Sequence, residues 1–312
     1  MRAIQVTEFG GPEVLVVRDV PEPVPGPGQV LVEVEAAGVN FAETMQTRDA
    51  YVSRTTLPYI PGSEVVGRAA DGRRLLGFSS TGAYAERALL DERSAAPLPD
   101  DVPAGVALAL LVQGATAALV LRDSGRMAAG ETVLIHAGAG GVGSLAIQLA
   151  RRWGAGHIVS TGSTVQKRAR ILELGADEAV DSAAPDLEAA LKAAAGNRRY
   201  DLVLDGVAGP AFTASLKLLN RRGRVVVYGA AGGDLSARVD PVALIGGSRT
   251  VAGFWLVDHL DEVPAAVGEL LGLVAEGALT PIVGGSYALE DAPRAHEDLT
   301  GRRTEGKLVL TP

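Results

Sequence analysis

A glycine-rich turn between a strand and a helix constrains the fold of this chain more than any other feature. Residues Thr132 to His136 form a short, apolar, β-branched run, as in a buried parallel strand. Gly138, Gly140 and Gly143 follow in G-x-G-x-x-G spacing, and apolar residues then recur at helical intervals as far as Trp153. This order of strand, turn and helix predicts a doubly wound Rossmann unit with a dinucleotide site, the alternative being a purely structural turn.

The backbone of this turn is the expected binding surface. One glycine makes the turn tight, one allows the backbone to approach a pyrophosphate, and one allows the helix to pack on the strand. The helix start also offers free N–H groups and the positive end of the helix dipole to phosphate oxygens. The residues that we expect to contact the pyrophosphate are Gly138, Gly140, Gly141, Val142 and Gly143.

The composition is typical of a two-domain α/β protein and excludes several functions. The 312 residues exceed one ordinary core, and 47% of them are hydrophobic. The net charge of -8 argues against nucleic acid or an anionic membrane as the partner. The absence of cysteine excludes disulfides, thiol catalysis and thiolate metal sites. We find no signal peptide and no apolar run long enough to span a bilayer, and we expect a cytoplasmic protein.

Two different patterns divide the chain into domains. Short strand-like runs separated by turn residues such as Asp71-Gly72 fill the N-terminal part and predict a small β-barrel domain. A helical pair from Ala104 to Leu121 is expected to break at Gln113-Gly114, and strands then alternate with helices. We assign residues 1–115 to the β domain, 116–256 to the Rossmann domain, and 257–312 to the completion of the β domain. A cleft between the two domains would suit hydride transfer.

The residues after the second Rossmann strand distinguish NADPH from NADH. An NAD site usually places an acidic residue on the ribose 2′-hydroxyl, about 20 residues beyond the glycines. No acidic residue lies between Gly154 and Lys167. Hydroxyl and cationic side chains suited to a 2′-phosphate occur there instead, namely Thr161, Ser163, Lys167 and Arg168. We therefore expect NADPH; the alternative is that the two cations only cover a solvated helix face.

Further segments, spread over nearly the whole chain, resemble one family. The chain is similar to the zinc-independent quinone oxidoreductases, the zeta-crystallin-like branch of the medium-chain dehydrogenase/reductases. The segments that carry the resemblance are A-G-V-N-F-A-E (Ala37–Glu43), P-G-S-E-V-V-G (Pro61–Gly67), Q-G-A-T-A (Gln113–Ala117), the glycine turn, Leu174–Asp181, Tyr200–Gly209, the G-R-V-V-V-Y-G strand and the closing G-K-L-V-L. The resemblance implies a GroES-like β-barrel domain, a Rossmann domain, NADPH in the cleft and often a homodimer.

The resemblance also implies roles for residues outside the turn. Asn40 matches an asparagine that contacts the nicotinamide ribose and lines the substrate site, and Thr116 matches a threonine near the nicotinamide. Lys167 matches a lysine on the adenine ribose phosphate. Tyr228 and Gly229 match a loop that passes beneath the cofactor.

Metal binding is not expected. The zinc alcohol dehydrogenases of this superfamily need a cysteine near position 40 and a histidine in a G-H-E motif, where this chain has Asn40 and Ser63. The histidines show no ligand spacing, and we expect them to be structural or on the surface. They are His136, His157, His259 and His296.

Three departures from the family pattern bear on the substrate. Glu43 stands where an aspartate is frequent, and Ser182 stands where a cofactor-binding tyrosine is common. The hairpin from Arg68 to Leu76 is shorter than usual. Specificity therefore does not transfer directly from relatives.

The expected chemistry is hydride transfer from a reduced nicotinamide to a quinone or to the β-carbon of a conjugated enone. Asn40, Thr116 and Tyr51 are the candidate catalytic residues that polarise the acceptor carbonyl. Tyr51 falls near a tyrosine that related enoyl reductases use as a proton donor, and a phenol is protonated at neutral pH; alternatively it caps a flexible loop. Glu43 either orients Asn40 or serves as a helix-start carboxylate, and Asp205 is expected to cap a turn.

Two other functions remain open. The G-F-W-L run resembles 2-enoyl thioester reductases, so an enoyl-CoA or enoyl carrier-protein substrate is the leading enzymatic alternative. The second alternative is a non-catalytic NADPH-binding protein, such as a sensor or a crystallin-like protein. The presence of Asn40 and Thr116 argues against it, because a pure binder needs neither.

Overall fold

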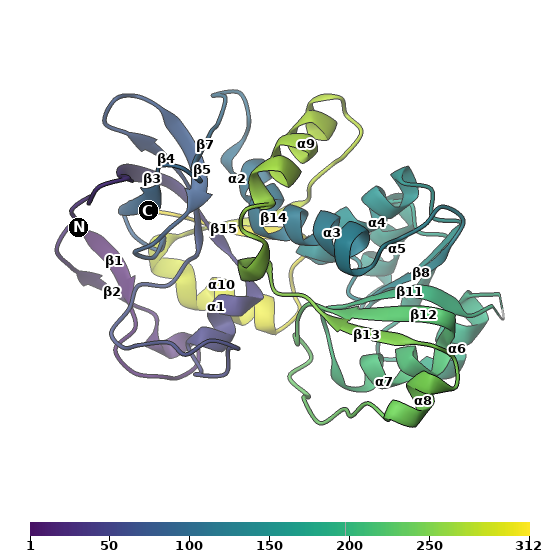
Figure 1. Cartoon of the computed structure of the whole chain (residues 1–312). Helices are drawn as coiled ribbons and strands as arrows, with labels where there is room; N and C mark the ends of the chain where they lie inside the picture. The colour runs from purple at the N-terminus through teal and green to yellow at the C-terminus, as the bar shows by residue number, and fades with distance from the viewer. Residues whose placement is uncertain (197) are drawn as a thin grey trace. The chain divides into compact units, whose positions relative to one another are not determined.

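The computed structural model describes residues 1–196 and 198–312, which form two compact units (Figure 1). Unit 1 comprises Met1–Val112 and Pro281–Pro312, and unit 2 comprises Gln113–Thr280. The chain therefore returns to the first unit at residue 281, whereas the sequence suggested residue 257. The difference is α9 (Val263–Ala275), which buries an apolar stripe and packs against α3 (Ala115–Leu119) of unit 2.

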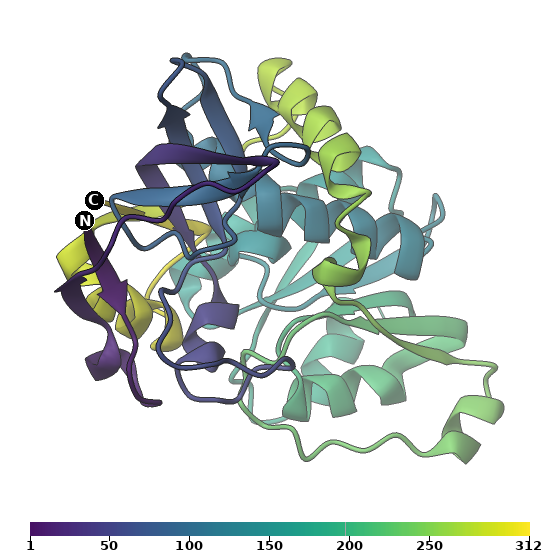
Figure 2. The same ribbon diagram turned by 60° about the vertical axis from the view of Figure 1, so that its left-hand side comes forward.

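Unit 1 is a β domain organised around one long strand, β3 (Gln29–Val39), which pairs with β15, β4 and β6. Its main sheet has the order β14-β15-β3-β4-β5-β7. Strands β1 and β2 form a separate antiparallel pair close to the N-terminus (Figure 2). The other strands are β1 (Arg2–Gln5), β2 (Val16–Asp19), β4 (Glu64–Ala69), β5 (Arg74–Phe78), β6 (Arg87–Asp91), β7 (Ala96–Pro97), β14 (Val283–Ala288) and β15 (Lys307–Thr311). The helices are α1 (Phe41–Gln46), α2 (Ala104–Leu108) and α10 (Ala292–Thr300), with 3-10 turns at Pro12–Val14 and Leu289–Asp291.

The apolar residues of these strands form the core of unit 1, which matches the expected GroES-like domain. Completely buried members of this core include Ile4, Val32, Val65, Leu90 and Leu310.

The predicted hairpin at Asp71-Gly72 is confirmed. It joins β4 to β5, and the Ala69 N–H donates to the Arg73 carbonyl at 2.9 Å. Gly72 has a φ of +89°, a conformation that glycine adopts without steric cost.

Unit 2 is the doubly wound α/β domain that the sequence predicts. Its sheet is parallel and has the order β10-β9-β8-β11-β12-β13 (Figure 1). This is the strand order of dinucleotide-binding Rossmann folds, in which ligands bind at the carboxyl ends of the strands. The strands are β8 (Thr132–Ile135), β9 (His157–Gly162), β10 (Glu178–Asp181), β11 (Tyr200–Asp205), β12 (Leu219–Val227) and β13 (Thr250–Gly253). The remaining helices are α4 (Gly141–Arg152), α5 (Val165–Glu173), α6 (Leu187–Ala194), α7 (Gly209–Leu218) and α8 (Pro241–Ile245), with a 3-10 turn at Leu256–His259.

The helical run from Ala104 to Ser124 differs from the prediction in two ways. It does not break at Gln113-Gly114, because Gly114 keeps helical dihedrals and π turns at Ala109–Gly114 and Val120–Ser124 absorb the irregularity. This 21-residue helix is also long and apolar enough to cross a membrane, whereas the sequence was expected to contain no apolar run of that length. Most of its apolar window (72%) is buried, as in a core helix of a globular protein.

Candidate functional site

The glycine turn after β8 is packed too closely for side chains. A Cβ atom on Gly138 would overlap the Ser160 hydroxyl of β9 and lie 2.9 Å from Ile147. A Cβ atom on Gly143 would overlap the Ala137 carbonyl oxygen and lie 2.8 Å from the Cα atom of Gly138. The glycines therefore allow the turn, β9 and the first turn of α4 to approach one another, as a dinucleotide turn requires.

The first turn of α4 offers backbone donors to an anion. Gly140 precedes the helix in an extended conformation, and among the described residues no side chain caps it. The first N–H groups of a helix have no partner within the helix, so those of Gly141, Val142 and Gly143 suit phosphate oxygens. The residues predicted from the motif thus lie together at the carboxyl end of β8.

A buried histidine supports the start of the turn. Thr161 Oγ1 accepts a hydrogen bond from the Ala137 N–H at 3.0 Å and lies 3.2 Å from His136 Nδ1. His136 Nε2 lies 2.8 Å from Ser215 Oγ, whose own proton goes to a backbone carbonyl of α7. His136 Nε2 therefore donates, and Nδ1 accepts from Thr161 in the neutral ring. Burial lowers the pKa of His136 and thereby favours this neutral form, whereas the charge of Asp205 acts in the opposite direction.

The position of Thr161 corrects one part of the sequence interpretation. Its hydroxyl was expected to face a 2′-phosphate, but it is buried and bonded within the turn. The physical reason is Ala137, whose φ of +54° begins the turn and whose N–H bonds to the Thr161 hydroxyl on β9.

The other residues predicted for the 2′-phosphate follow β9 directly. Thr164 caps α5 by accepting from the Lys167 N–H at 3.1 Å, and Ser163 and Lys167 are partly exposed. Arg168 Nη1 lies 3.2 Å from Asp181 Oδ2 at the end of β10. The positive charge of Arg168 is therefore partly neutralised within the protein.

The carboxyl ends of β11 and β12 meet at two glycines. Asp205 Oδ1 accepts from two N–H groups of the next turn at 2.8 and 3.0 Å, so its predicted turn-capping role is confirmed. A Cβ atom on Gly206 would lie 2.7 Å from the Tyr228 ring, and one on Gly229 would lie 3.1 Å from the Gly206 carbonyl oxygen. Burial, with the charge of Asp205, raises the pKa of Tyr228.

Gln113 and Thr116 come from the helical run before β8. Thr116 is 7% exposed on α3. The side chain of Gln113 occupies the place that a Cβ atom on Gly141 would take, at the start of α4. Its Oε1 atom is buried and has no hydrogen-bond partner among the described residues. A buried oxygen without a donor is costly, so this position fits a ligand that brings one.

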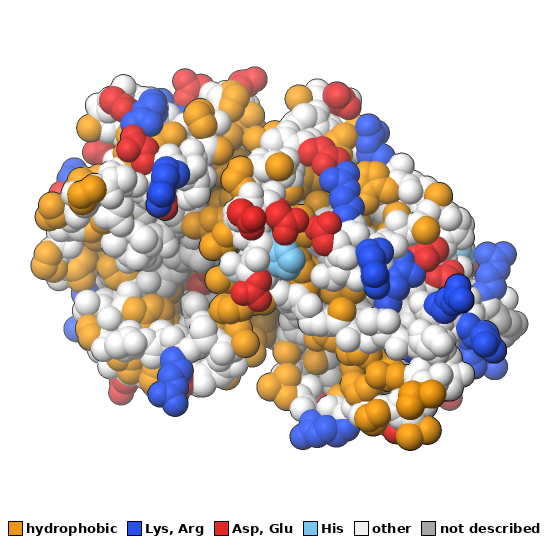
Figure 3. Space-filling model, in the orientation of Figure 1, with side chains coloured by type: hydrophobic (Ala, Val, Ile, Leu, Met, Phe, Trp, Pro, Cys, Tyr) orange, Lys and Arg blue, Asp and Glu red, His pale blue; other side chains and the backbone are white. Residues whose placement is uncertain are grey.

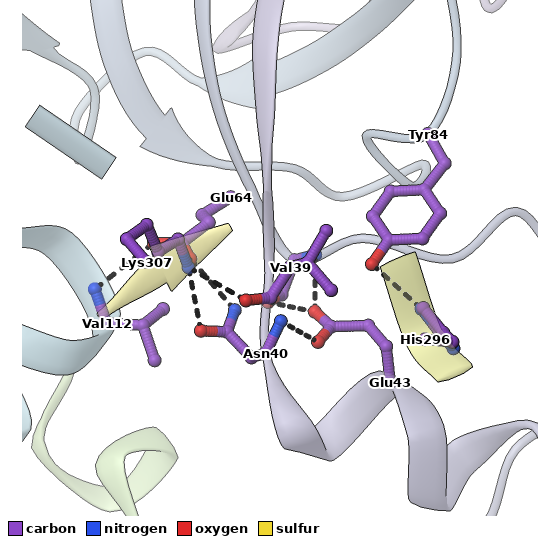
Figure 4. A network of polar contacts seen from close by, with 9 residues as sticks. Val39, Asn40, Glu43, Glu64, Tyr84, Val112, His296 and Lys307 are labelled. Carbon is purple, nitrogen blue, oxygen red and sulfur yellow. Dashed lines mark hydrogen bonds and ion pairs between the residues drawn. The ribbon is translucent and has the colours of Figure 1, made fainter. Parts of the chain in front are cut away.

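In unit 1 a second cluster surrounds Asn40 (Figure 4). Its Nδ2 atom donates to Glu64 Oε1 at 2.8 Å, and its Oδ1 atom accepts from Lys307 Nζ at 2.8 Å. Lys307 also pairs directly with Glu64 and donates to the Val39 carbonyl at 3.3 Å. The Val112 N–H donates to the second oxygen of Glu64 at 3.2 Å. Glu64 and Lys307 are completely buried, and Asn40 is 7% exposed. We call Asn40, Glu64 and Lys307 the Asn40 network.

Glu43 holds the backbone of Asn40. Its Oε2 atom accepts from the Asn40 N–H at 2.9 Å, and its Oε1 atom accepts from Ser63 Oγ at 2.8 Å. Burial raises the pKa of Glu43, opposed by the Ser63 hydrogen bond and the Lys307 charge. Glu43 is therefore a helix-start carboxylate of α1 and also anchors the backbone of Asn40. The two roles that the sequence left as alternatives occur together.

The positions that hold zinc ligands in the zinc alcohol dehydrogenases carry the hydrogen-bonded Asn40 and Ser63. Within residues 1–196 and 198–312, no three His, Cys, Asp or Glu side chains are grouped to hold a metal ion. His296 is buried and lies 3.1 Å from the Tyr84 hydroxyl, and burial lowers the pKa of His296 to about 4. His157 and His259 are partly exposed. Tyr51 lies, partly exposed, in the irregular segment between α1 and β4.

The fold and the glycine turn define the class of protein. A GroES-like β domain joined to a Rossmann domain is the architecture of a medium-chain dehydrogenase/reductase. Two family models match the chain, the alcohol dehydrogenase GroES-like domain at residues 26–72 and the zinc-binding dehydrogenase at residues 141–276.

Similarity to individual proteins extends over the full length. The rat quinone oxidoreductase is 35% identical over 99% of this chain and 97% of its own length. The Escherichia coli quinone oxidoreductase, solved in complex with NADPH, matches at a TM-score of 0.93 and 31% identity, with 100% of both chains covered. A mycobacterial protein solved with NADPH matches at a TM-score of 0.92 and 38% identity over the same share. The chain belongs to the zeta-crystallin-like quinone oxidoreductase branch of the medium-chain dehydrogenase/reductases, and is an oxidoreductase.

The sequence interpretation missed several residues of these clusters. Glu64 and Lys307 lie in the P-G-S-E and G-K-L-V-L segments, which contributed to the resemblance without an assigned role. A charged residue within two positions of a glycine in each segment was the available signal. Gln113 opens the Q-G-A-T-A segment, which also contributed to the resemblance without a role for this residue. Ser215 carried no local signal, because its contact with His136 depends on how α7 packs.

Proposed function

We propose that this chain is an NADPH-dependent oxidoreductase that transfers hydride to a quinone or a conjugated enone without a metal. The observation that carries the proposal is the uncapped start of α4 behind a turn without room for side chains. The end of β9, which lacks a carboxylate, supports NADPH over NADH. The relatives named quinone oxidoreductase support the acceptor, and two of the solved relatives were complexes with NADPH.

Residues of unit 2 would hold the cofactor mainly through backbone and cationic groups. The backbone of residues 138–143 faces the pyrophosphate in this proposal. Ser163, Lys167 and Arg168 bind the 2′-phosphate in this proposal, with Lys167 as the principal cation because the family resemblance matches it to a lysine on that phosphate. Tyr228 and Gly229 form the loop beneath the cofactor.

When bound, the reduced nicotinamide supplies the hydride. In unit 1 the Asn40 amide uses one N–H and one oxygen lone pair within its network, which leaves a second N–H for the acceptor carbonyl. A donor placed where negative charge develops stabilises the transition state. Thr116 and Tyr51 are the other proposed donors, and Tyr51 would supply the proton that completes the reduction.

We also propose that the protein is a homodimer. Among the described strands β13 ends the order of its sheet, and an unpaired edge strand is a template for pairing with another chain. The preceding helix, α8, exposes Val242 and Ile245 by 71% and 77% in an apolar patch (Figure 3). Light scattering should give the mass of a dimer for the wild type and the mass of a monomer for the double variant Val242→Lys/Ile245→Lys. A monomeric wild type would contradict this proposal.

One assay separates the candidate functions. NADPH oxidation is followed with 1,4-benzoquinone or with crotonyl-CoA as the acceptor, and we expect steady turnover with the quinone. Turnover with crotonyl-CoA alone would indicate a 2-enoyl thioester reductase. Tight NADPH binding with turnover of neither compound would indicate a binding protein, and no NADPH binding would overturn the proposal.

A further inference from the structure

The Asn40 network contains more buried charge than a helix cap requires. Glu64 begins β4, Lys307 begins β15, and neither side chain is exposed. A buried ion pair contributes little net stability, because desolvation of the two charges offsets most of their attraction. Stability of unit 1 therefore does not by itself account for the pair.

We propose that Glu64 and Lys307 are positioning residues that fix the rotation of the Asn40 side-chain amide. This inference rests on the proposed function, since it concerns the N–H group that Asn40 offers to the acceptor.

The two charged partners of the Asn40 amide have opposite hydrogen-bonding capacity. An ammonium group can only donate hydrogen bonds and a carboxylate can only accept them. Lys307 must therefore face Oδ1 of Asn40, and Glu64 must face Nδ2, as their distances of 2.8 Å show (Figure 4). An asparagine amide between two neutral partners could turn by half a rotation and exchange its donor with its acceptor. The charged pair excludes that alternative, and it thereby fixes the direction of the second Nδ2 hydrogen.

Several hydrogen bonds hold each of the two charged side chains in place. The three ammonium protons of Lys307 have three acceptors, namely Asn40, Glu64 and the Val39 carbonyl. Glu64 accepts from Asn40 and Lys307 through Oε1 and from the Val112 N–H through Oε2. Neither charged side chain can rotate without losing a buried partner, which would cost about 1–3 kcal/mol.

The backbone beside the network is adapted to the carboxylate. A Cβ atom on Gly38 would overlap Oε1 of Glu64 and lie 2.6 Å from its Cδ atom. Asn40 lies two residues after Gly38, and only glycine at position 38 of β3 lets the Glu64 carboxylate reach it. The A-G-V-N and P-G-S-E segments are therefore complementary parts of one arrangement.

The test is a double-mutant cycle between Asn40→Ala and the neutral pair Glu64→Gln/Lys307→Met. In the wild-type background we expect Asn40→Ala to lower kcat for benzoquinone by roughly a hundredfold. The neutral pair alone should lower kcat by roughly tenfold or more, with KM for NADPH within about twofold of wild type. In the neutral-pair background Asn40→Ala should then cost at most about tenfold, because part of the contribution of the amide is already lost when it is no longer oriented. An equal cost of Asn40→Ala in both backgrounds, or a neutral pair with wild-type kcat, would overturn the inference.

A second readout needs neither cofactor nor turnover. The sequence contains three asparagines, so asparagine-selective ¹⁵N labelling gives few side-chain amide signals, and Asn40→Ala identifies the signal of Asn40. We expect its two amide protons to be resolved and slow to exchange in the wild type. Exchange with water should be at least roughly tenfold faster in the neutral pair, because opening becomes easier. Unchanged exchange would contradict the fixed rotation.

Two further variants separate positioning from folding. The neutral pair leaves no uncompensated buried charge and should still fold, with a lower Tm because Lys307→Met removes the donor to Asn40 and to the Val39 carbonyl. If it fails to fold, Gly38→Ala displaces the Glu64 carboxylate without a change of charge and should lower kcat in the same way. Arg74→Met is the matched control, because Arg74 is a buried cation of unit 1 whose partners are Glu35 and the carbonyls of Pro99 and Val102. It should lower Tm and leave kcat of the folded protein unchanged.

The outcomes also distinguish this inference from the proposed function. A folded wild type without NADPH-dependent turnover would overturn the proposed function and this inference with it. A wild type that turns over benzoquinone while the cycle shows no coupling would overturn this inference alone.

Discussion

The glycine turn of unit 2 and the Asn40 network of unit 1 are built in opposite ways. The turn is one contiguous stretch that works through backbone N–H groups. The network joins side chains that are 24 to 267 residues apart in the sequence, brought together by the pairing of β3 with β4 and β15. A backbone site is therefore broken by added atoms, whereas a side-chain site is broken by removed partners. Substitutions in the two regions should therefore differ in kind and in size.

Gly143→Val should remove NADPH binding. The new side chain would overlap the Ala137 carbonyl and approach the Gly138 Cα atom, and neither backbone atom can move without opening the turn. We expect the affinity for NADPH to fall by at least roughly a hundredfold, or about 3 kcal/mol, in a calorimetric titration. Wild-type affinity in this variant would contradict the backbone site.

Acid should destabilise unit 1 through His296. The pKa of His296 is lowered by burial from the ordinary value of 6.5 to about 4, and the charge of Arg48 adds to this effect. The unfolded chain therefore binds the proton more readily, and stability present above pH 6.5 is lost as the pH falls through about 4. The loss is about 3 kcal/mol in the free energy of unfolding.

Urea unfolding between these pH values measures that loss. His296→Gln should flatten the pH dependence, because the variant has no group to protonate at this position. An unchanged slope in the variant would show that other groups, such as the buried His136 of unit 2, cause the acid sensitivity.

Lys167→Ala tests the 2′-phosphate end of the cofactor site, which depends on side chains and not on the backbone. A charge-assisted bond to phosphate contributes about 1.5–3 kcal/mol, so the affinity for NADPH should fall by roughly tenfold or more. The affinity for NADH, which has no 2′-phosphate, should change by less than about twofold. Equal losses for the two nucleotides would refute the phosphate role of Lys167.

Gly268→Ala is the matched glycine substitution and has the smallest expected effect. Gly268 lies inside α9, and a Cβ atom there would meet no described atom within 4 Å beyond its own helix backbone. Alanine should stabilise the helix by up to about 1 kcal/mol and leave NADPH binding unchanged. Weaker NADPH binding would show that glycine substitutions disturb unit 2 in general. The effect of Gly143→Val could then no longer be assigned to the turn.

The same difference explains how much of the site could be predicted from the sequence. Strand, glycine spacing and helical period of the turn fall within one window, so its elements and their order were predictable. The partners of Asn40 were not, because they depend on strand pairing across most of the chain. Thr161 shows the limit for a single residue: a hydroxyl after β9 suits either a phosphate or the Ala137 N–H, and only the fold decides between them.

The domain boundary and the helical run differ from the sequence predictions for related reasons. An apolar helix such as α9 can pack on either unit, and its amphipathic pattern does not say which. Gln113-Gly114 reads locally as a break, but tertiary packing holds Gly114 in helical dihedrals.

Titration of the folded wild-type protein with NADPH and NADH tests the central claim most directly. If the turn of residues 138–143 binds the pyrophosphate and Lys167 binds the 2′-phosphate, NADPH should bind one to one and at least roughly tenfold more tightly than NADH. Equal affinity for the two nucleotides would contradict the phosphate assignment, and no binding of either nucleotide would contradict the dinucleotide site itself.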